Sequence, residues 1–261
     1  MANKEHDVVI GDYTNLSMRD AHHRRQLEHD YDEDTVCNLN CTEWIKEWYK
    51  YVYKWPYDNS PLRLTYDDLG AFVPKKGSPE EDQWKFSTGK SDSDDETCKE
   101  SVWFLAYPIY NYNPSGTVTK FVTPPLGKWH FLVPLYNCHP SMQLYPSIKS
   151  DQELFQMAKS DVDKAYHVQA TLDGIHLTGY RVSIDKHFQI KLPGGNMNTF
   201  GVPDKELGKE NTMELVSDGY WIWLKELPLG DHILELKNHS SVYDVDIKFY
   251  LSVRGPSPKC L

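Results

Sequence analysis

The chain has 261 residues and a formal net charge of −10, and 39% of its residues are hydrophobic. No cluster of Lys and Arg could neutralise a run of phosphates, and no run of 18 apolar residues exists, so the sequence predicts neither a nucleic-acid partner nor a membrane span. The 13% aromatic content, with 17 Tyr and 8 Trp, is enough to build a core. A small neutral or cationic ligand suits this acidic chain better than an anionic one.

Changes in composition along the chain divide it into four regions. Residues 1–36 are predicted to form a polar acidic arm, in which histidines and carboxylates could bind divalent cations or simply form a solvated charged segment. Residues 37–100 contain a helix and then a long loop, rich in Pro, Gly, Ser and Asp, that packs on the main domain. Residues 101–254 are the predicted β-sandwich domain, and residues 255–261 are a tail.

The first predicted helix covers residues 42–55 and has one strongly aromatic face. Asn40 and Glu43 have the spacing of a helix N-cap, and Pro56 ends the helix. The aromatic face consists of residues at helical spacing, namely Trp44, Trp48, Tyr51, Val52 and Trp55. Such a face requires a partner surface elsewhere in the fold.

The rest of the chain is predicted to be mainly β, interrupted by one helix that opens at the capping box Ser150–Glu153. A tight hairpin is expected at Asp173-Gly174. The predicted strands lie at 102–112, 117–123, 129–136, 167–172, 175–184 and 187–192, at both ends of 216–236, and at 243–253. About nine short strands with one inserted helix favour a jelly-roll-like antiparallel β-sandwich.

The strand that begins near residue 216 is apolar on both faces. Because side chains alternate along a strand, Tyr220, Ile222 and Leu224 point to one side of the sheet. Trp221 and Trp223 point to the other side. Two interpretations follow: the two tryptophans are covered by the aromatic helix, or they form an exposed platform that stacks a carbohydrate-like ligand.

Three further aromatic residues could extend such a platform: Tyr110, Tyr112 and Trp129. The predicted ligand-binding set therefore comprises these three residues together with Trp221 and Trp223.

Histidines near the third predicted strand suggest a metal site. His130 and His139, with His187 or His232 from neighbouring strands, could bind a divalent metal as in cupin-like jelly rolls. The His-x-His pair typical of such sites is absent. The alternative is that these histidines are satisfied by hydrogen bonds near the rim of the sheet. Paired carboxylates for glycoside hydrolysis, drawn from Glu214, Asp218 and Glu226, are a further alternative.

The five cysteines are an odd number, so at least one is unpaired. We expect two disulfides, with Cys260 free and with Cys98–Cys138 joining two β segments. Cys37 and Cys41 lack the second pair of ligands that a zinc site would need.

Three short segments, together with the aromatic helix, resemble an uncharacterised group of prokaryotic, often exported, β-rich proteins. They are Val102-Trp103-Phe104-Leu105-Ala106, Phe200-Gly201-Val202-Pro203 and Ser217-Asp218-Gly219-Tyr220-Trp221. The resemblance covers roughly residues 42–250 and implies an extracytoplasmic or secreted location. It implies no activity, so no functional residue is transferred.

No motif in the sequence names a reaction, and the Gly-x-Ser-x-Gly pattern of serine hydrolases is absent. The favoured hypothesis is a β-sandwich that binds a neutral or cationic, carbohydrate-like ligand. The alternatives are a metal-dependent or acid/base enzyme with its site in the sandwich, and a structural protein that interacts with partners.

Overall fold

A computed structural model describes residues 39–57, 60, 62, 102–107, 117–124, 130–241 and 244–254. The predicted arm, most of the long loop, the tail and the segment at 108–112 lie outside these residues. Within them the protein is mainly β, with two α-helices and two sheets. The helices and strands are α2 (Cys41–Tyr53), β1 (Val102–Phe104), β2 (Thr117–Val122), β3 (His130–Cys138), α4 (Asp151–Val162), β4 (Ala165–Leu172), β5 (Ile175–Leu177), β6 (Tyr180–Lys191), β7 (Thr212–Leu224), β8 (Gly230–Ser240) and β9 (Asp244–Val253).

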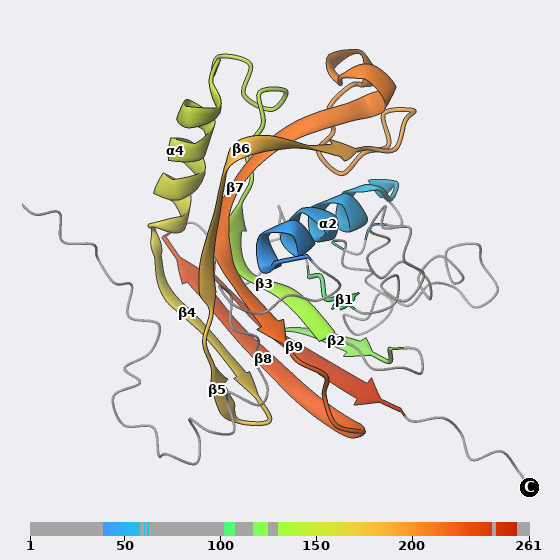
Figure 1. Ribbon diagram of the computed structural model, residues 1–261, viewed down its shortest axis with the longest axis vertical. Helices are drawn as coiled ribbons and strands as arrows, with labels where there is room; N and C mark the ends of the chain where they lie inside the picture. The colour runs from blue at the N-terminus through green and yellow to red at the C-terminus, as the bar shows by residue number, and fades with distance from the viewer. Residues whose placement is uncertain are drawn as a thin grey trace, which may run out of the picture.

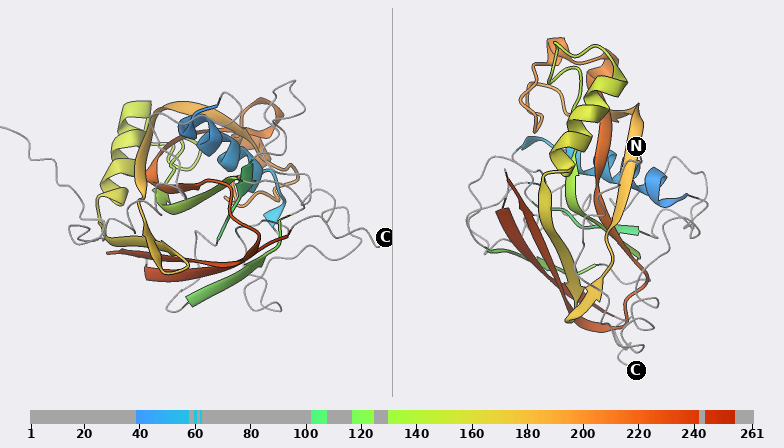
Figure 2. Two further views of the ribbon diagram at one scale, coloured as in Figure 1. Left: turned by 60° about the horizontal axis from the view of Figure 1, so that its bottom comes forward. Right: turned by 90° about the vertical axis from the view of Figure 1, so that its left-hand side faces the viewer.

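The strands form a four-stranded sheet, called sheet 1, with the order β1-β3-β7-β6, and a five-stranded sheet, called sheet 2, with the order β2-β9-β8-β4-β5. Figures 1 and 2 show the two sheets facing each other, with α2 on the far side of sheet 1. Most neighbouring strands are antiparallel, but β1 pairs with β3 and β2 pairs with β9 in parallel. The prediction of a mainly β, two-sheet fold is confirmed, whereas its jelly-roll topology is not.

One hydrophobic core lies between the two sheets. Sheet 1 contributes buried side chains that include Phe131, Val133, Tyr220 and Ile222, and sheet 2 contributes Leu234, Leu236, Ile247 and Phe249. Each such side chain stabilises the fold by roughly 1.5–3 kcal/mol when it leaves water. Helix α4 packs against β3, β6 and β7, and it buries Leu154, Ala158 and Val162. The predicted cap is confirmed, because the Ser150 side chain accepts a hydrogen bond from the Glu153 amide.

A second core lies between α2 and the other face of sheet 1. It joins Trp44, Ile45 and Trp48 of the helix to Trp221 and Trp223 of β7. The predicted helix start is confirmed, because the Asn40 side chain accepts a hydrogen bond of 3.0 Å from the Glu43 amide. Strand β7 thus contributes to both cores, as the apolar residues on its two faces predicted.

The chain crosses from sheet 2 to sheet 1 between β5 and β6, so the expectation of one continuous strand over 175–184 was wrong. Gly179 lies at this crossing, and a Cβ there would approach Leu135 Cδ1 to 2.5 Å. Any larger residue at this position would require the buried Leu135 side chain to move. The hairpin at Asp173-Gly174 is confirmed: it joins β4 to β5, with φ values of 52° and 80°.

The expected pairing of Cys98 with Cys138 is not formed. Cys41 and Cys138 are free thiols. Cys41 belongs to the core under α2, whereas Cys138 packs against the core between the sheets. Sheet 1 therefore separates the two thiols, and the other three cysteines lie outside the described residues.

In the part of the chain that the structure describes, no helix is long and apolar enough to cross a membrane.

Candidate functional site

Helix α2 occupies the face of sheet 1 on which an aromatic platform was considered. Trp221 and Trp223 are only 1% and 2% exposed. The Trp48 ring meets the Trp221 ring edge to face, with centroids 5.2 Å apart. The two tryptophans therefore belong to the core. The hypothesis of an exposed platform was wrong, and the alternative, in which the aromatic helix covers them, is confirmed. Tyr110, Tyr112 and Trp129 lie outside the described residues.

The two histidines of the proposed metal site do not meet. His130 is the first residue of β3, and His139 follows the last residue of the same strand. At about 3.3 Å per residue, nine extended residues separate them by roughly 30 Å. They cannot share one metal ion, so this part of the prediction was wrong.

His139 instead forms a buried pair with Tyr53 of α2. The Tyr53 hydroxyl and His139 Nε2 are joined by a short hydrogen bond, and both residues are 1% exposed. Burial lowers the pKa of His139 to about 3, because the interior penalises the charged imidazolium. The ring is therefore held in its neutral form at physiological pH.

The other two candidate histidines lie on different sheets, and each has its own carboxylate partner. His187 of β6 lies 2.8 Å from Asp151, which holds the pKa of His187 above its usual value. His232 of β8 lies 2.7 Å from Asp173. Both sites are satisfied histidines near the edges of the fold, which was the alternative left open by the sequence.

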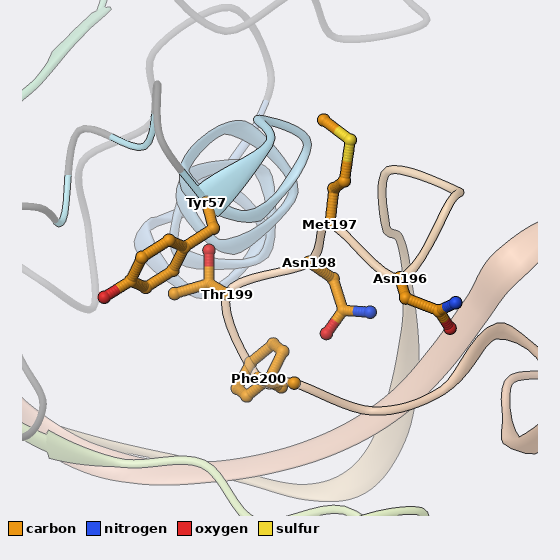
Figure 3. A pocket seen from close by; sticks show the side chains of 7 residues that line it. Tyr57, Asn196, Met197, Asn198, Thr199 and Phe200 are labelled. Atoms are coloured by element: carbon orange, nitrogen blue, oxygen red, sulfur yellow. The ribbon is translucent and has the colours of Figure 1, made fainter.

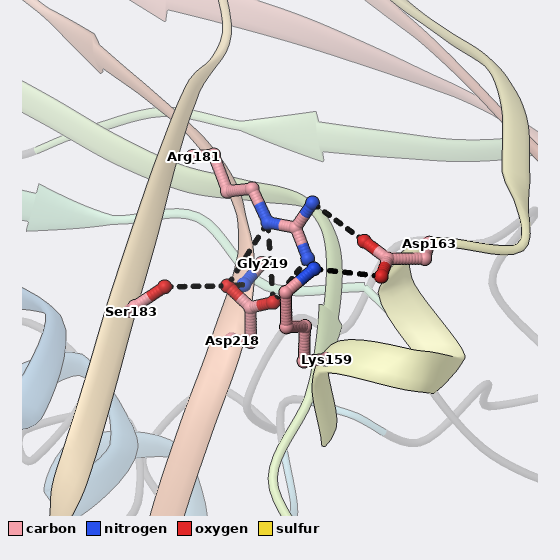
Figure 4. Close-up of polar contacts among 6 residues, drawn as sticks. All are labelled: Lys159, Asp163, Arg181, Ser183, Asp218 and Gly219. Carbon is pink, nitrogen blue, oxygen red and sulfur yellow. Dashed lines mark hydrogen bonds and ion pairs between the residues drawn. The ribbon is translucent and has the colours of Figure 1, made fainter. Parts of the chain in front are cut away.

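The carboxylates considered for hydrolysis are not brought together as a catalytic pair either. Asp218 of β7 is 1% exposed and is held by Arg181 and Ser183 of β6 (Figure 4). Glu214 accepts a hydrogen bond from Gln189 on the same sheet. Nε of Arg181 lies 3.1 Å from Asp218, and Nη1 lies 2.7 Å from Asp163 after α4. The network ties α4 to sheet 1, which is a structural role.

An open pocket of about 440 Å³ lies between the segment that follows α2 and the loop after β6 (Figure 3). Its lining residues are Tyr57, Asn196, Met197, Asn198, Thr199, Phe200 and Gly201. None of these carries a charge. Tyr57 is 39% exposed and Met197 is 49% exposed, so apolar surface is open to solvent at its mouth.

Hydrogen bonds hold the pocket loop in a defined conformation. The Asn198 side chain donates to the Val202 carbonyl at 2.7 Å and accepts from the Val202 amide at 3.1 Å. The Asp204 carboxylate accepts from the amides of Gly195 and Asn196. The Tyr57 amide donates to the Met197 carbonyl at 2.7 Å, which fastens the two sides of the pocket together. The pocket is therefore formed before any ligand binds.

The lining has one buried polar atom and one aromatic contact with the core. Thr199 Oγ1 is buried and has no hydrogen-bond partner among the described residues. Such a hydroxyl can both donate and accept, and leaving it unpaired is costly. The ring of Phe200 packs against the Tyr53 ring, with centroids 4.4 Å apart and planes tilted by 36°, and so connects the lining to the buried Tyr53–His139 pair.

The pocket was not predicted from the sequence. Its local signal was the run of Gly194, Gly195 and Asn196, which predicts a turn. Nothing in that run indicates that Tyr57, about 140 residues earlier, forms the opposite wall.

Within the described residues, no group of three or more His, Cys, Asp or Glu side chains could hold a metal ion. Comparison of the chain with family models, with curated proteins and with solved structures gives no match.

Proposed function

We propose that the protein binds a small neutral ligand rich in hydroxyl groups, of the carbohydrate type, in the pocket between Tyr57 and residues 196–201. The observation that carries the proposal is a lining without charged side chains, in which the aromatic side chains of Tyr57 and Phe200 lie beside the amide side chain of Asn196. The proposal moves the expected binding site away from Trp221 and Trp223.

The chemistry of the lining selects the ligand class. An anion or a cation would lose hydration without finding an opposite charge, so a charged ligand is disfavoured. Tyr57 offers an aromatic face for the C–H groups of a sugar ring, and the exposed Asn196 side chain can exchange hydrogen bonds with a sugar hydroxyl. A volume of about 440 Å³ falls in the range of roughly 300–1,000 Å³ that is typical of small-molecule sites.

The preformed loop also favours binding over catalysis. A rigid pocket avoids the entropic cost of ordering a loop around the ligand. Among the described residues, no His, Cys, Asp, Glu, Lys or Arg side chain lines the pocket, and Tyr53 with His139 lies buried behind Phe200. The jelly-roll type of the sandwich and the extracytoplasmic location stay predictions from the sequence.

Titration with a panel of neutral mono- and disaccharides, followed by calorimetry and by ligand-observed NMR, tests the proposal. We expect binding by at least one member of the panel, weakened at least tenfold by Tyr57→Ala. Tyr145→Ala is the matched control, because Tyr145 is 43% exposed and does not line the pocket. No binding by any sugar, or equal binding by the parent and the Tyr57→Ala variant, would overturn the proposal.

A further inference from the structure

A β-bulge on sheet 2 gathers three rings at the edge of its outer surface. Along the β4–β8 pair, Ala165 pairs with Ser240 and His167 with His239, so Tyr166 is an extra residue in β4. A bulge of this kind changes the direction of the side chains around it. As a result the His239 ring lies 5.1 Å from the His167 ring and 6.4 Å from the Tyr166 ring.

The two imidazoles have the separation that a shared metal ion requires. Imidazole nitrogens bind Zn²⁺ at about 2.0–2.1 Å, and two such rings in adjacent coordination positions have centroids roughly 4.5–5.3 Å apart. The observed distance of 5.1 Å lies in this range. The planes are inclined by 29°, so the His167 side-chain torsions must adjust, with His239 held by Asp246 and the strands unmoved, before both rings face one ion.

Each histidine shows a second feature of a metal ligand. His167 Nε2 is buried and has no hydrogen-bond partner among the described residues. His239 Nε2 lies 3.0 Å from Asp246 Oδ1 on β9. Metal-binding histidines commonly donate their other ring N–H to a carboxylate, which fixes the ring and strengthens the ligand.

We propose that His167 and His239 form a binding site for one divalent transition-metal ion of the Zn²⁺ or Ni²⁺ class, with Asp246 as the residue that orients His239. The two nitrogen ligands select this class over Mg²⁺ and Ca²⁺, which prefer oxygen. The site has two protein ligands, consistent with the lack of a larger cluster among the described residues, and water completes the coordination. This site is distinct from the neutral pocket.

The test is calorimetric titration of Zn²⁺ into the full chain after treatment with a chelator. The acidic arm also carries histidines, so the parent protein for the test has His6, His22, His23 and His29 replaced by Ala. We expect one ion per chain, with affinity reduced at least tenfold by His167→Ala and by His239→Ala. His176→Ala is the matched control, because His176 is an exposed histidine on β5 of the same sheet.

Two further measurements separate a specific site from a folding defect. In the parent protein, NMR signals of the His167 and His239 rings should shift together as Zn²⁺ is added, without any change in the fold. Asp246→Asn should weaken binding about 10–100-fold, as removal of such orienting carboxylates does elsewhere. Zn²⁺ binding that leaves these two rings unshifted, or that survives the His167→Ala/His239→Ala double variant, would overturn the proposal.

Discussion

Trp48 of α2 and Trp221 of β7 meet edge to face, with ring centroids 5.2 Å apart and planes at 81°. The Trp48 indole N–H also donates to the Leu105 carbonyl, just beyond β1, at 2.9 Å. One helical residue therefore contacts both the centre of sheet 1 and its edge. Trp48 and Trp221 stand 173 positions apart in the sequence, yet the aromatic helix and the two-faced strand form a single structural unit.

Truncation of Trp221 should destabilise the protein strongly. Trp221→Ala removes a fully buried ring and leaves a cavity under α2, so we expect a loss of about 3–5 kcal/mol in the free energy of unfolding. Urea denaturation followed by circular dichroism measures this loss. Tyr145→Ala removes an aromatic ring that is 43% exposed, and its effect should stay within about 0.5 kcal/mol. A Trp221→Ala variant as stable as the Tyr145 variant would contradict the packing described above.

Local signals in the sequence predicted the elements of this core well. The caps at Asn40 and Ser150 were recognisable because a side-chain acceptor at that spacing satisfies an amide of the first helical turn. The alternation along 243–253 predicted β9, whose buried residues include Ile247, Phe249 and Leu251. In each case residues close in sequence carry the whole signal.

Features that depend on distant residues could not be predicted in this way. The pocket joins Tyr57 to residues 196–201, and no periodic pattern relates the two segments. His130 and His139 looked close in sequence, but an extended strand separates them. The crossing at Gly179 reflects the position of Leu135 on another strand, which a single pattern of apolar residues cannot reveal.

The Tyr53–His139 hydrogen bond should contribute measurably to stability. Tyr53→Phe keeps the ring but removes the hydroxyl, which deprives the buried His139 Nε2 of this partner. We expect a loss of about 1–3 kcal/mol in the free energy of unfolding near neutral pH. Tyr166→Phe is the control, because the Tyr166 side chain is 64% exposed. Equal stability of the two variants would show that the buried hydrogen bond contributes nothing.

Burial of His139 also predicts a pH dependence of stability. Its pKa is about 3 in the folded protein and about 6.5 in the unfolded chain, so between these values the unfolded state binds more protons. The stabilisation is therefore complete above pH 6.5 and falls by up to about 1.4 kcal/mol per pH unit as the pH decreases toward 3. Chemical denaturation at pH 7.5, 6 and 5 measures this slope.

The His139→Asn variant provides the comparison for this slope, since Asn does not titrate. Its stability should depend less steeply on pH over the same range, whatever its stability at pH 7.5. Parallel slopes for the variant and the parent protein would contradict a role for His139 in acid sensitivity.

The ion pair between Arg181 and Asp218 should be far more important than a pair on the surface. Arg181→Met leaves a carboxylate that is 1% exposed without its cation, and we expect a loss of about 3–5 kcal/mol. Arg254→Met is the matched control, because Arg254 and Asp231 form a pair with both side chains more than half exposed. That variant should lose less than about 1 kcal/mol. Similar midpoints in urea for the two variants would argue against the network that ties α4 to sheet 1.

Cys41 and Cys138 should react slowly with thiol reagents in the folded protein. Burial raises the pKa of each thiol to about 12, and for Cys138 the nearby Asp161 carboxylate acts in the same direction. At pH 8 only about one thiol in ten thousand would be the reactive thiolate, compared with roughly a quarter for an unperturbed cysteine.

Iodoacetamide labelling followed by peptide mass spectrometry distinguishes these two positions from Cys37, Cys98 and Cys260. We expect Cys41 and Cys138 to be labelled only after denaturant is added. Rapid labelling of Cys138 under native conditions would contradict the burial of the Cys138 thiol at the end of β3 that α4 covers.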